Sequence, residues 1–443
     1  MDILNTKVKK LYNSYLFPSL IAGMVISIYA FVDTIAVGQS EGPNGAAALA
    51  IINPLFSISS LIGMLFGVGG SVLYAQAKGE KDDKKGRLYF TASLWLFIGV
   101  MAICWLFVIL FYREILYFFG GDENLMPLIL EYGIWIVYSF PSFALSIYLS
   151  SLIRADGNPK LVMRAVVFGG LVNIFGDWFF VFPLKMGIEG AAIATVLGSL
   201  VQVLILISYF FHKNCHLRLT KLLNPLKDLS KTTIIGFSAS IIELAFIVLS
   251  IMLNKQVMLY GDATTLAVFG VACTCSMMFQ KLFTGASQAM QPIVAANFSA
   301  SNQSRVKETF KLSMQTVIIM GIICTLLGIL FPEAIIKLFI DVTQDVLNVG
   351  PSIIRIYFLS FLFMGVNILA TFYLQSIMFT RLSNILALLR GLFISCLLLL
   401  ILPHFIGVSG VWWAVVLTEV ITVFITVAVL FGVMRTRKTV YGG

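Results

Sequence analysis

The sequence predicts an all-α polytopic membrane protein with twelve transmembrane helices in two parallel six-helix repeats. Three observations predict this fold: an apolar composition, regularly spaced apolar segments, and a repeat at half the chain length. Of the 443 residues, 59% are hydrophobic and only 12% are charged, and the mean hydropathy is +0.96. A soluble domain is about 45–50% apolar and about 25% charged, so this composition excludes a soluble protein.

Apolar segments long enough to cross a bilayer define the expected helices. A transmembrane helix needs about 20 consecutive, mainly apolar residues, and segments of this kind follow one another along the whole chain. Their predicted limits are 15–38, 46–77, 88–112, 125–148, 159–182, 188–211, 232–254, 264–291, 310–332, 346–372, 384–405 and 408–433.

The basic residues are distributed unevenly over the expected loops. With a cytoplasmic amino terminus, 24 of the 30 lysines and arginines fall on the cytoplasmic side and four on the other side. The positive-inside rule explains this distribution, so the net charge of +9 does not indicate a nucleic-acid partner. We expect a multi-pass protein of the cell (inner) membrane, monomeric in the lipid bilayer, with both termini cytoplasmic.

A repeat relates the two halves of the chain. The sequence GIEGA at 187–191 opens the sixth span, and GVSGV at 407–411 opens the twelfth, at an offset of 220 residues. Six spans return the chain to its starting side, so the halves are expected to be parallel repeats with the substrate path between them, near the midplane. The predicted domains are an amino-terminal lobe (1–211), a cytoplasmic linker (212–231) and a carboxy-terminal lobe (232–443).

Asp33 is the only carboxylate in the first predicted span. Inserting a charged side chain at membrane depth costs about 2.5–3.5 kcal/mol or more, so such a residue faces protein or water and is a functional candidate by default. At a rise of 1.5 Å per residue, three other residues reach the same depth, in the outer third of the membrane: Tyr132 in the fourth span, Asp177 in the fifth and Thr195 in the sixth. Asn173 lies one turn below Asp177, on the same helical face.

This set of oxygen-bearing side chains predicts an ion-coupling site. Two neighbouring carboxylates, an amide, a phenol and a hydroxyl can hold a proton or coordinate a small cation such as Na⁺. A static polar cluster that ties the helices together is the alternative. Interhelical hydrogen bonds in membranes average only about 0.6 kcal/mol, less than the cost of inserting a carboxylate, and this difference favours a function for Asp33 and Asp177.

Two further residues have expected roles. Pro18 lies one turn into the first span, where a proline removes a backbone hydrogen bond and bends a helix. Glu243 is the only acid inside the seventh predicted span. It is a candidate contact for a cationic substrate or a second ion, with a lone protonated glutamate as the alternative.

Several short motifs, in order along the chain, resemble the multidrug and toxic compound extrusion (MATE) family. They are VDTI-x-VG at 32–38, the N-x-x-x-D motif at 173–177, the QPIV-x-x-N run at 291–297 and the G-x-x-G-V-W start of the last span at 407–412. The match runs nearly end to end. Each motif alone is weak, but together with the half-chain repeat they are specific.

The resemblance implies a V-shaped pair of six-helix lobes and cation-coupled antiport. It implies export of amphipathic, mostly cationic compounds in exchange for H⁺ or Na⁺, with an ion site in the amino-terminal lobe. The family residues of that site correspond to those found by depth, with a helix-bending proline fifteen residues before the first aspartate: Pro18, Asp33, Tyr132, Asn173, Asp177 and Thr195. Glu243 resembles one acid of a second, carboxy-terminal site, but the tenth span lacks an acid to complete it.

Other functions make different demands on the sequence. A flippase or exporter of a lipid-linked or other endogenous metabolite on the same fold needs several basic residues in its cavity, and the span interiors hold essentially Lys281. A channel would differ from a carrier in that an imposed ion gradient would not drive substrate transport against the substrate's own gradient. A membrane-embedded enzyme needs a catalytic set, and the histidines (His212, His216, His404) have no metal-ligand or triad spacing. We therefore expect no enzyme, no cofactor and no metal beyond Na⁺ at Asp33, Asn173, Asp177 and Thr195.

Overall fold

The computed structural model describes residues 3–119, 123, 126–221, 225–260, 263–339 and 344–441. All regular elements in these ranges are helices. Helices satisfy every backbone hydrogen bond within one segment, which an apolar chain inside a bilayer requires. The predicted all-α class is therefore confirmed.

Ten helical segments of the described residues are long and apolar enough to cross a membrane, as a polytopic protein requires. They are Val8–Glu41, Ile51–Gly79, Asp83–Leu110, Met126–Asp156, Pro159–Val181, Gly187–Phe211, Gln303–Leu330, Val346–Ser376, Thr380–Ile406 and Ser409–Val433. The seventh and eighth predicted spans correspond to helices α7 (Pro225–Tyr260) and α8 (Ala263–Ser299). Many side chains of α7, and those of residues 263, 264, 266 and 267 in α8, lie outside the described residues.

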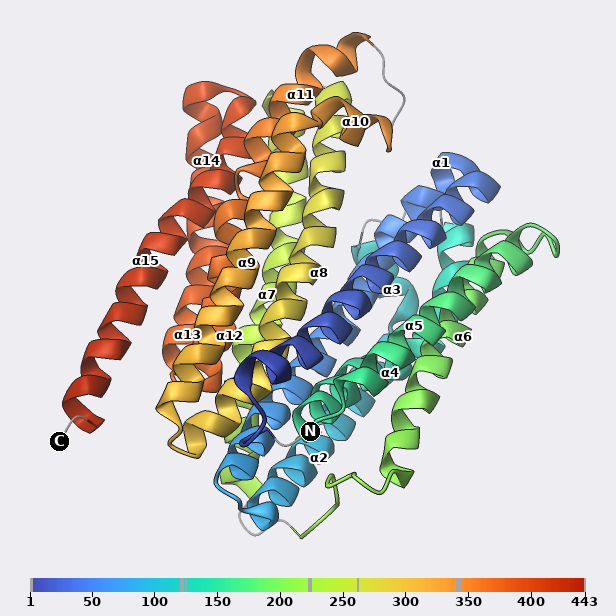
Figure 1. Cartoon of the computed structure of the whole chain (residues 1–443). Helices are drawn as coiled ribbons and strands as arrows, with labels where there is room; N and C mark the ends of the chain where they lie inside the picture. Colours follow the sequence, from blue (N-terminus) through green and yellow to red (C-terminus); the bar gives the residue numbers. More distant parts are fainter. Residues whose placement is uncertain are drawn as a thin grey trace. The chain divides into compact units, whose positions relative to one another are not determined.

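The first two predicted spans form one helical element, α1 (Val8–Gly79), rather than two helices joined by a loop. A straight helix of 72 residues would be about 108 Å long, and Figure 1 shows that α1 instead turns back on itself. A Cβ atom on Gly45 would lie 2.6 Å from Glu41 Cβ and 2.9 Å from Val37 Cγ1. The first predicted span ends at 38 and the second begins at 46, but the chain stays helical through the residues between them.

Contacts between Cα atoms divide the chain into two units, Met1–Glu243 with Ala295–Val306, and Leu244–Val294 with Lys307–Gly443. After α1, the first unit contains α2 (Asp83–Leu110), α3 (Tyr112–Phe118), α4 (Met126–Asp156), α5 (Pro159–Gly176), a π-helical turn η1 (Asp177–Val181), α6 (Gly187–Ile207), a 3₁₀ turn η2 (Ser208–Phe211) and the first part of α7.

The second unit contains the rest of α7 and most of α8. It continues with α9 (Gln303–Leu330), α10 (Pro332–Lys337), α11 (Gln344–Phe358), α12 (Phe361–Ser376), α13 (Thr380–Leu388), a π-helical turn η3 (Leu389–Phe393), α14 (Ile394–Ile406) and α15 (Ser409–Tyr441). The tenth predicted span is thus divided between α11 and α12, and the eleventh is one continuous run from α13 through η3 to α14.

The limits of the first unit differ from the lobe expected at 1–211, for two visible reasons. The start of α7 packs backbone to backbone on α1, where a Cβ on Gly236 would lie 1.6 Å from the carbonyl oxygen of Leu65. Arg305 donates hydrogen bonds of 3.1 and 2.6 Å to the carbonyls of Ile3 and Thr6. These contacts join residues 225–243 and 295–306 to the amino-terminal bundle.

Glycines set the spacing of the helices that hold the predicted site. A Cβ on either Gly169 or Gly198 would lie 2.7 Å from the carbonyl oxygen of the other residue. The backbones of α5 and α6 therefore touch at this crossing, as small residues allow in membrane helices. Asn173 follows Gly169 by about one turn of α5, and Thr195 precedes Gly198 by about one turn of α6, so the close crossing brings their side chains together.

Candidate functional site

The predicted site lies inside the first unit, where Asp33 of α1 accepts hydrogen bonds from two other helices. The Tyr132 hydroxyl of α4 donates to Asp33 Oδ2 at 3.3 Å, and the Thr195 hydroxyl of α6 donates to Asp33 Oδ1 at 3.2 Å. Tyr132 and Thr195 are both buried. Each carboxylate oxygen of Asp33 is therefore held by a different helix.

Asn173 extends this network from α5. Its side-chain amide donates a hydrogen bond of 3.1 Å to Thr195 Oγ1, which itself donates to Asp33. The amide oxygen, Asn173 Oδ1, is buried and accepts no hydrogen bond from the protein. An ordered relay thus runs from α5 through α6 to α1, with one free acceptor at its end.

Asp177 completes the site and differs from Asp33 in its surroundings. It begins the π-helical turn η1, is 0% exposed, and lies close enough to Asp33 for the two carboxylates to interact electrostatically. Both of its carboxylate oxygens are buried without a hydrogen-bond partner. π-helical turns inside α-helices are frequent at functional sites, and this one carries an acid that the protein itself does not satisfy.

These two carboxylates cannot both be charged without a compensating positive charge. An isolated buried charge costs several kcal/mol unless it is paired. Neither acid forms an ion pair with a lysine, arginine or histidine in the described part of the chain. The unused oxygens of Asp177 and Asn173 supply hard-oxygen ligands, so the arrangement is suited to a bound proton or a small monovalent cation.

The structure thus brings five of the predicted site residues together. Pro18 is buried in α1, fifteen positions before Asp33. Glu243 belongs to α7, but its side chain lies outside the described residues.

Sequence reasoning missed a second polar centre in the first unit, around Asp156 at the end of α4. The hydroxyls of Tyr74 and Tyr209 each donate to this carboxylate at 2.8 Å, and Lys78 Nζ pairs with it at 3.0 Å. The backbone N–H of His216 also donates to it, at 2.9 Å. Asp156 precedes a Gly-Asn pair, which is typical of a loop, so its burial had no signal in the sequence.

The second unit contains a buried ion pair that the sequence did not predict. Arg390 in η3 makes a bidentate pair with Glu419 of α15, at 2.7 Å from Nη2 and 2.9 Å from Nε to Oε1. Asn367 of α12 donates to Glu419 Oε2 at 2.7 Å, and Thr426 donates to Asn367 Oδ1 at 3.2 Å. The sequence places Arg390 among the 24 basic residues expected on the cytoplasmic side, where the positive-inside rule accounts for it without a partner.

The fold and the site together define the class of the protein. Two homologous sets of membrane-spanning helices, with an acid site buried in the first, are typical of secondary transporters. Comparisons with known proteins agree: the family described as MatE matches residues 18–179 and 238–401, more than half of the chain. The chain therefore belongs to the MatE family of transporters.

Relatives match over nearly the full length. The multidrug export protein MepA of Staphylococcus aureus (strain MSSA476) is 25% identical over 425 residues, 96% of this chain and 93% of that protein. MepA of Staphylococcus haemolyticus (strain JCSC1435) is 24% identical over the same share of both chains.

A solved structure establishes the fold. A multidrug resistance MATE family transporter of the MOP superfamily, in an outward-facing conformation, superimposes with a TM-score of 0.90 at 21% identity, covering 98% of this chain and 97% of that one. This likeness confirms the predicted fold class of twelve transmembrane helices in two six-helix repeats.

Proposed function

We propose that the protein is a cation-coupled antiporter that exports amphipathic, mostly cationic compounds in exchange for H⁺ or Na⁺. The observation that carries the proposal is the unsatisfied carboxylate of Asp177 beside Asp33. A static cluster would satisfy these oxygens with protein donors, because an unpaired buried acceptor costs about 1–3 kcal/mol. The multidrug export function named for the MepA relatives supports the cargo.

The mechanism follows from the positions of the side chains. With both termini cytoplasmic, in the cell (inner) membrane, the Asp33 end of the first unit faces outward, and a cation enters there. Binding of one cation neutralises one of the two negative charges of Asp33 and Asp177. At Asp33 it weakens the bonds from Tyr132 and Thr195, because a carboxylate is a stronger acceptor than its neutralised form. Helix α1 then bends at Pro18, and the substrate leaves outward.

The ion and the substrate are coupled because they stabilise different positions of α1. An ion at Asp33 and Asp177 favours one position of α1, and the substrate favours the other, so each ligand lowers the affinity for the other by the same factor. Export driven by the ion gradient requires only that the ion and the substrate weaken each other's binding in this way.

Reconstitution into proteoliposomes tests the proposal. Efflux of the cationic dye ethidium is measured with a pH gradient and a sodium gradient imposed separately, for the wild type, Asp33→Asn and the control Glu114→Gln, an exposed acid of α3. We expect at least one gradient to drive efflux in the wild type and the control, and neither in Asp33→Asn, although all three insert into the membrane. Full gradient-driven efflux by Asp33→Asn would contradict the proposal.

A further inference from the structure

Three buried hydroxyls in the first unit have no hydrogen-bond partner in the protein. They are Tyr15 Oη and Ser19 Oγ of α1 and Ser150 Oγ of α4, in side chains that are 1%, 6% and 7% exposed. Buried polar groups are nearly always hydrogen-bonded, and where the protein offers no partner, ordered water usually does. These hydroxyls therefore indicate water inside the helix bundle.

Two of the hydroxyls, those of Tyr15 and Ser150, lie at one depth, far from the acid site. Tyr15 precedes Asp33 by 18 positions on α1, and Ser150 follows Tyr132 by 18 positions on α4, which runs in the opposite direction. Because Tyr132 contacts Asp33, both residues lie about 27 Å below that contact. Ser19 is one turn closer to the acid site than Tyr15.

A row of serines connects the two levels. On α4, Ser142, Ser146 and Ser150 follow one another at steps of four residues, on one helix face and about 6 Å apart. A single water spans such a gap with two ordinary hydrogen bonds of about 2.8 Å. At the upper end, Ser142 Oγ lies 2.7 Å from Ser199 Oγ, and Ser199 is one turn of α6 after Thr195.

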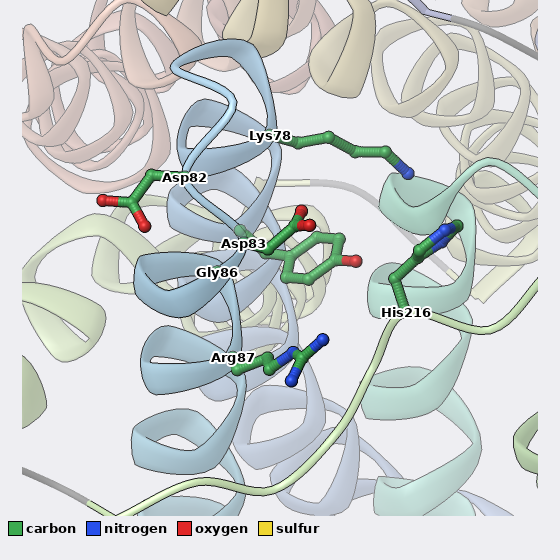
Figure 2. Close-up of a pocket in the computed structure, with 7 residues that line it drawn as sticks. Lys78, Asp82, Asp83, Gly86, Arg87 and His216 are labelled. Carbon is green, nitrogen blue, oxygen red and sulfur yellow. The ribbon is translucent and has the colours of Figure 1, made fainter.

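At the lower end the row approaches Asp156, the buried centre that binds Tyr74, Tyr209, Lys78 and His216. Tyr15 lies within electrostatic range of Asp156. Three of the Asp156 partners, Tyr74, Lys78 and His216, also line a pocket with Asp82, Asp83, Gly86 and Arg87. Figure 2 shows the side chains of Lys78, Arg87 and His216 directed toward this common space, and the His216 side chain is 59% exposed. The pocket thus lies beside the buried carboxylate, and three partners of that carboxylate are in its lining.

We propose that this polar row is the route by which protons leave the Asp33–Asp177 site toward the cytoplasm, with Asp156 at its exit. The inference rests on the proposed function and specifies the ion as H⁺. A proton leaves the neutralised acid, each water in the row accepts one proton and donates one, and a proton emerges into the water of the pocket. Ser142 and Ser146 hold these waters as acceptors, because their hydroxyls donate to the Ser139 and Phe143 carbonyls of their own helix. After the transfer, every group in the row has its original protonation state. The net change is therefore one proton moved from the acid site to the water of the pocket.

The unpaired hydroxyls allow a test that separates transport from packing. The triple variant Tyr15→Phe, Ser19→Ala, Ser150→Ala removes three groups that bond to nothing in the protein, so folding stability should be unchanged or raised. Ser71→Ala is the matched control, because Ser71 is equally buried in the same unit but bonds to the Val68 carbonyl of its own helix. Proteoliposomes loaded with the pH dye pyranine report proton movement, and ethidium reports substrate movement.

We expect the triple variant to lose about tenfold in turnover of both proton and ethidium, equivalent to about 1.4 kcal/mol on the barrier, with the KM for ethidium unchanged. Ser71→Ala should transport like the wild type. Wild-type rates in the triple variant, while Asp33→Asn is inactive, would overturn the route and leave the antiport intact. Wild-type transport driven by sodium alone would also overturn the route, and transport driven by neither gradient would overturn both proposals.

Discussion

The Thr195 hydroxyl donates a hydrogen bond of 3.2 Å to Asp33 Oδ1, across 162 positions of the chain. The Tyr132 hydroxyl holds the other oxygen of the same carboxylate. A change in the charge of Asp33 therefore alters the attachment of α1 to α4 and α6 at once. This relationship explains how one small ion can move a helix, and it leads to the first prediction.

Replacing Thr195 by valine removes the donor and keeps the shape of the side chain. A hydrogen bond to a charged group contributes about 1.5–3 kcal/mol, and this bond stabilises the charged carboxylate of Asp33 over its protonated form. Its loss favours protonation, so we expect the proton concentration at half-maximal ethidium efflux to fall about tenfold or more. Thr195→Ser keeps the hydroxyl and should stay near the wild type, and equal values for the valine and serine variants would contradict the role of the hydroxyl.

Asp177→Asn should uncouple transport and stabilise the protein at the same time. The substitution removes a charge whose two oxygens have no protein partner, so we expect the free energy of unfolding in detergent, at high pH without sodium, to increase by about 1–3 kcal/mol. Thermal unfolding followed by tryptophan fluorescence measures this change. A lower melting temperature would show that Asp177 is a structural group with a partner.

The Arg390–Glu419 pair should behave as a structural unit of the second half. Breaking a buried pair from one side costs about 3–5 kcal/mol, whereas replacing both partners by apolar residues is often neutral. We expect Arg390→Met to lower stability strongly and Arg390→Met with Glu419→Leu to recover most of it. The control is Lys85→Met, which breaks an exposed pair with Glu80 and should cost no more than about 1 kcal/mol.

If the double variant stays as unstable as the single one, the Arg390–Glu419 pair has a role beyond the mutual neutralisation of its two charges. Loss of gradient-driven efflux in a stable double variant would lead to the same conclusion.

Cys215 reports whether residues 212–221 are docked on Asp156. Burial raises the pKa of the Cys215 thiol, so the reactive thiolate is scarcer at neutral pH than in an exposed cysteine. Alkylation by a water-soluble maleimide should be slow and should accelerate with rising pH. In Asp156→Ala, His216 loses both of its bonds to the carboxylate, and the rate should increase.

A cysteine placed at the exposed Leu219, in a Cys215→Ser background, gives the reference rate for an accessible thiol. The two rates are compared with Asp156 intact. If Cys215 of the wild type reacts as fast as the cysteine at position 219 in the Cys215→Ser background, the segment is not docked.

The site residues could be predicted from the sequence because polar groups are rare inside apolar segments. Asp33, Asn173 and Asp177 stand out from their surroundings, and helical rise alone is sufficient to compare their depths. Tyr132 and Thr195 were found by the same comparison. Depth along a helix is a one-dimensional property, and the sequence specifies it directly.

Side-chain partners across helices were much harder to predict. Spans that are apolar on all faces contain little information about their rotation, so nothing indicated that Arg390 would face Glu419 or that Tyr209 would face Asp156. The continuity of α1 through 42–45 was also hidden, because glycine and proline there favour a turn in either case. The bonds of Arg305 to Ile3 and Thr6 join segments with no sequence relation.

The most direct test of a shared cation pocket at Asp33 and Asp177 is ion displacement by substrate in purified protein. Ethidium is added to detergent-solubilised protein in weak buffer, and the release of protons, or of preloaded radioactive sodium, is measured beside dye binding. The wild type should release one of these ions as the dye binds, and Asp33→Asn and Asp177→Asn should bind dye without releasing either. Dye binding to the wild type without release, or equal release from Asp177→Asn, would contradict the pocket.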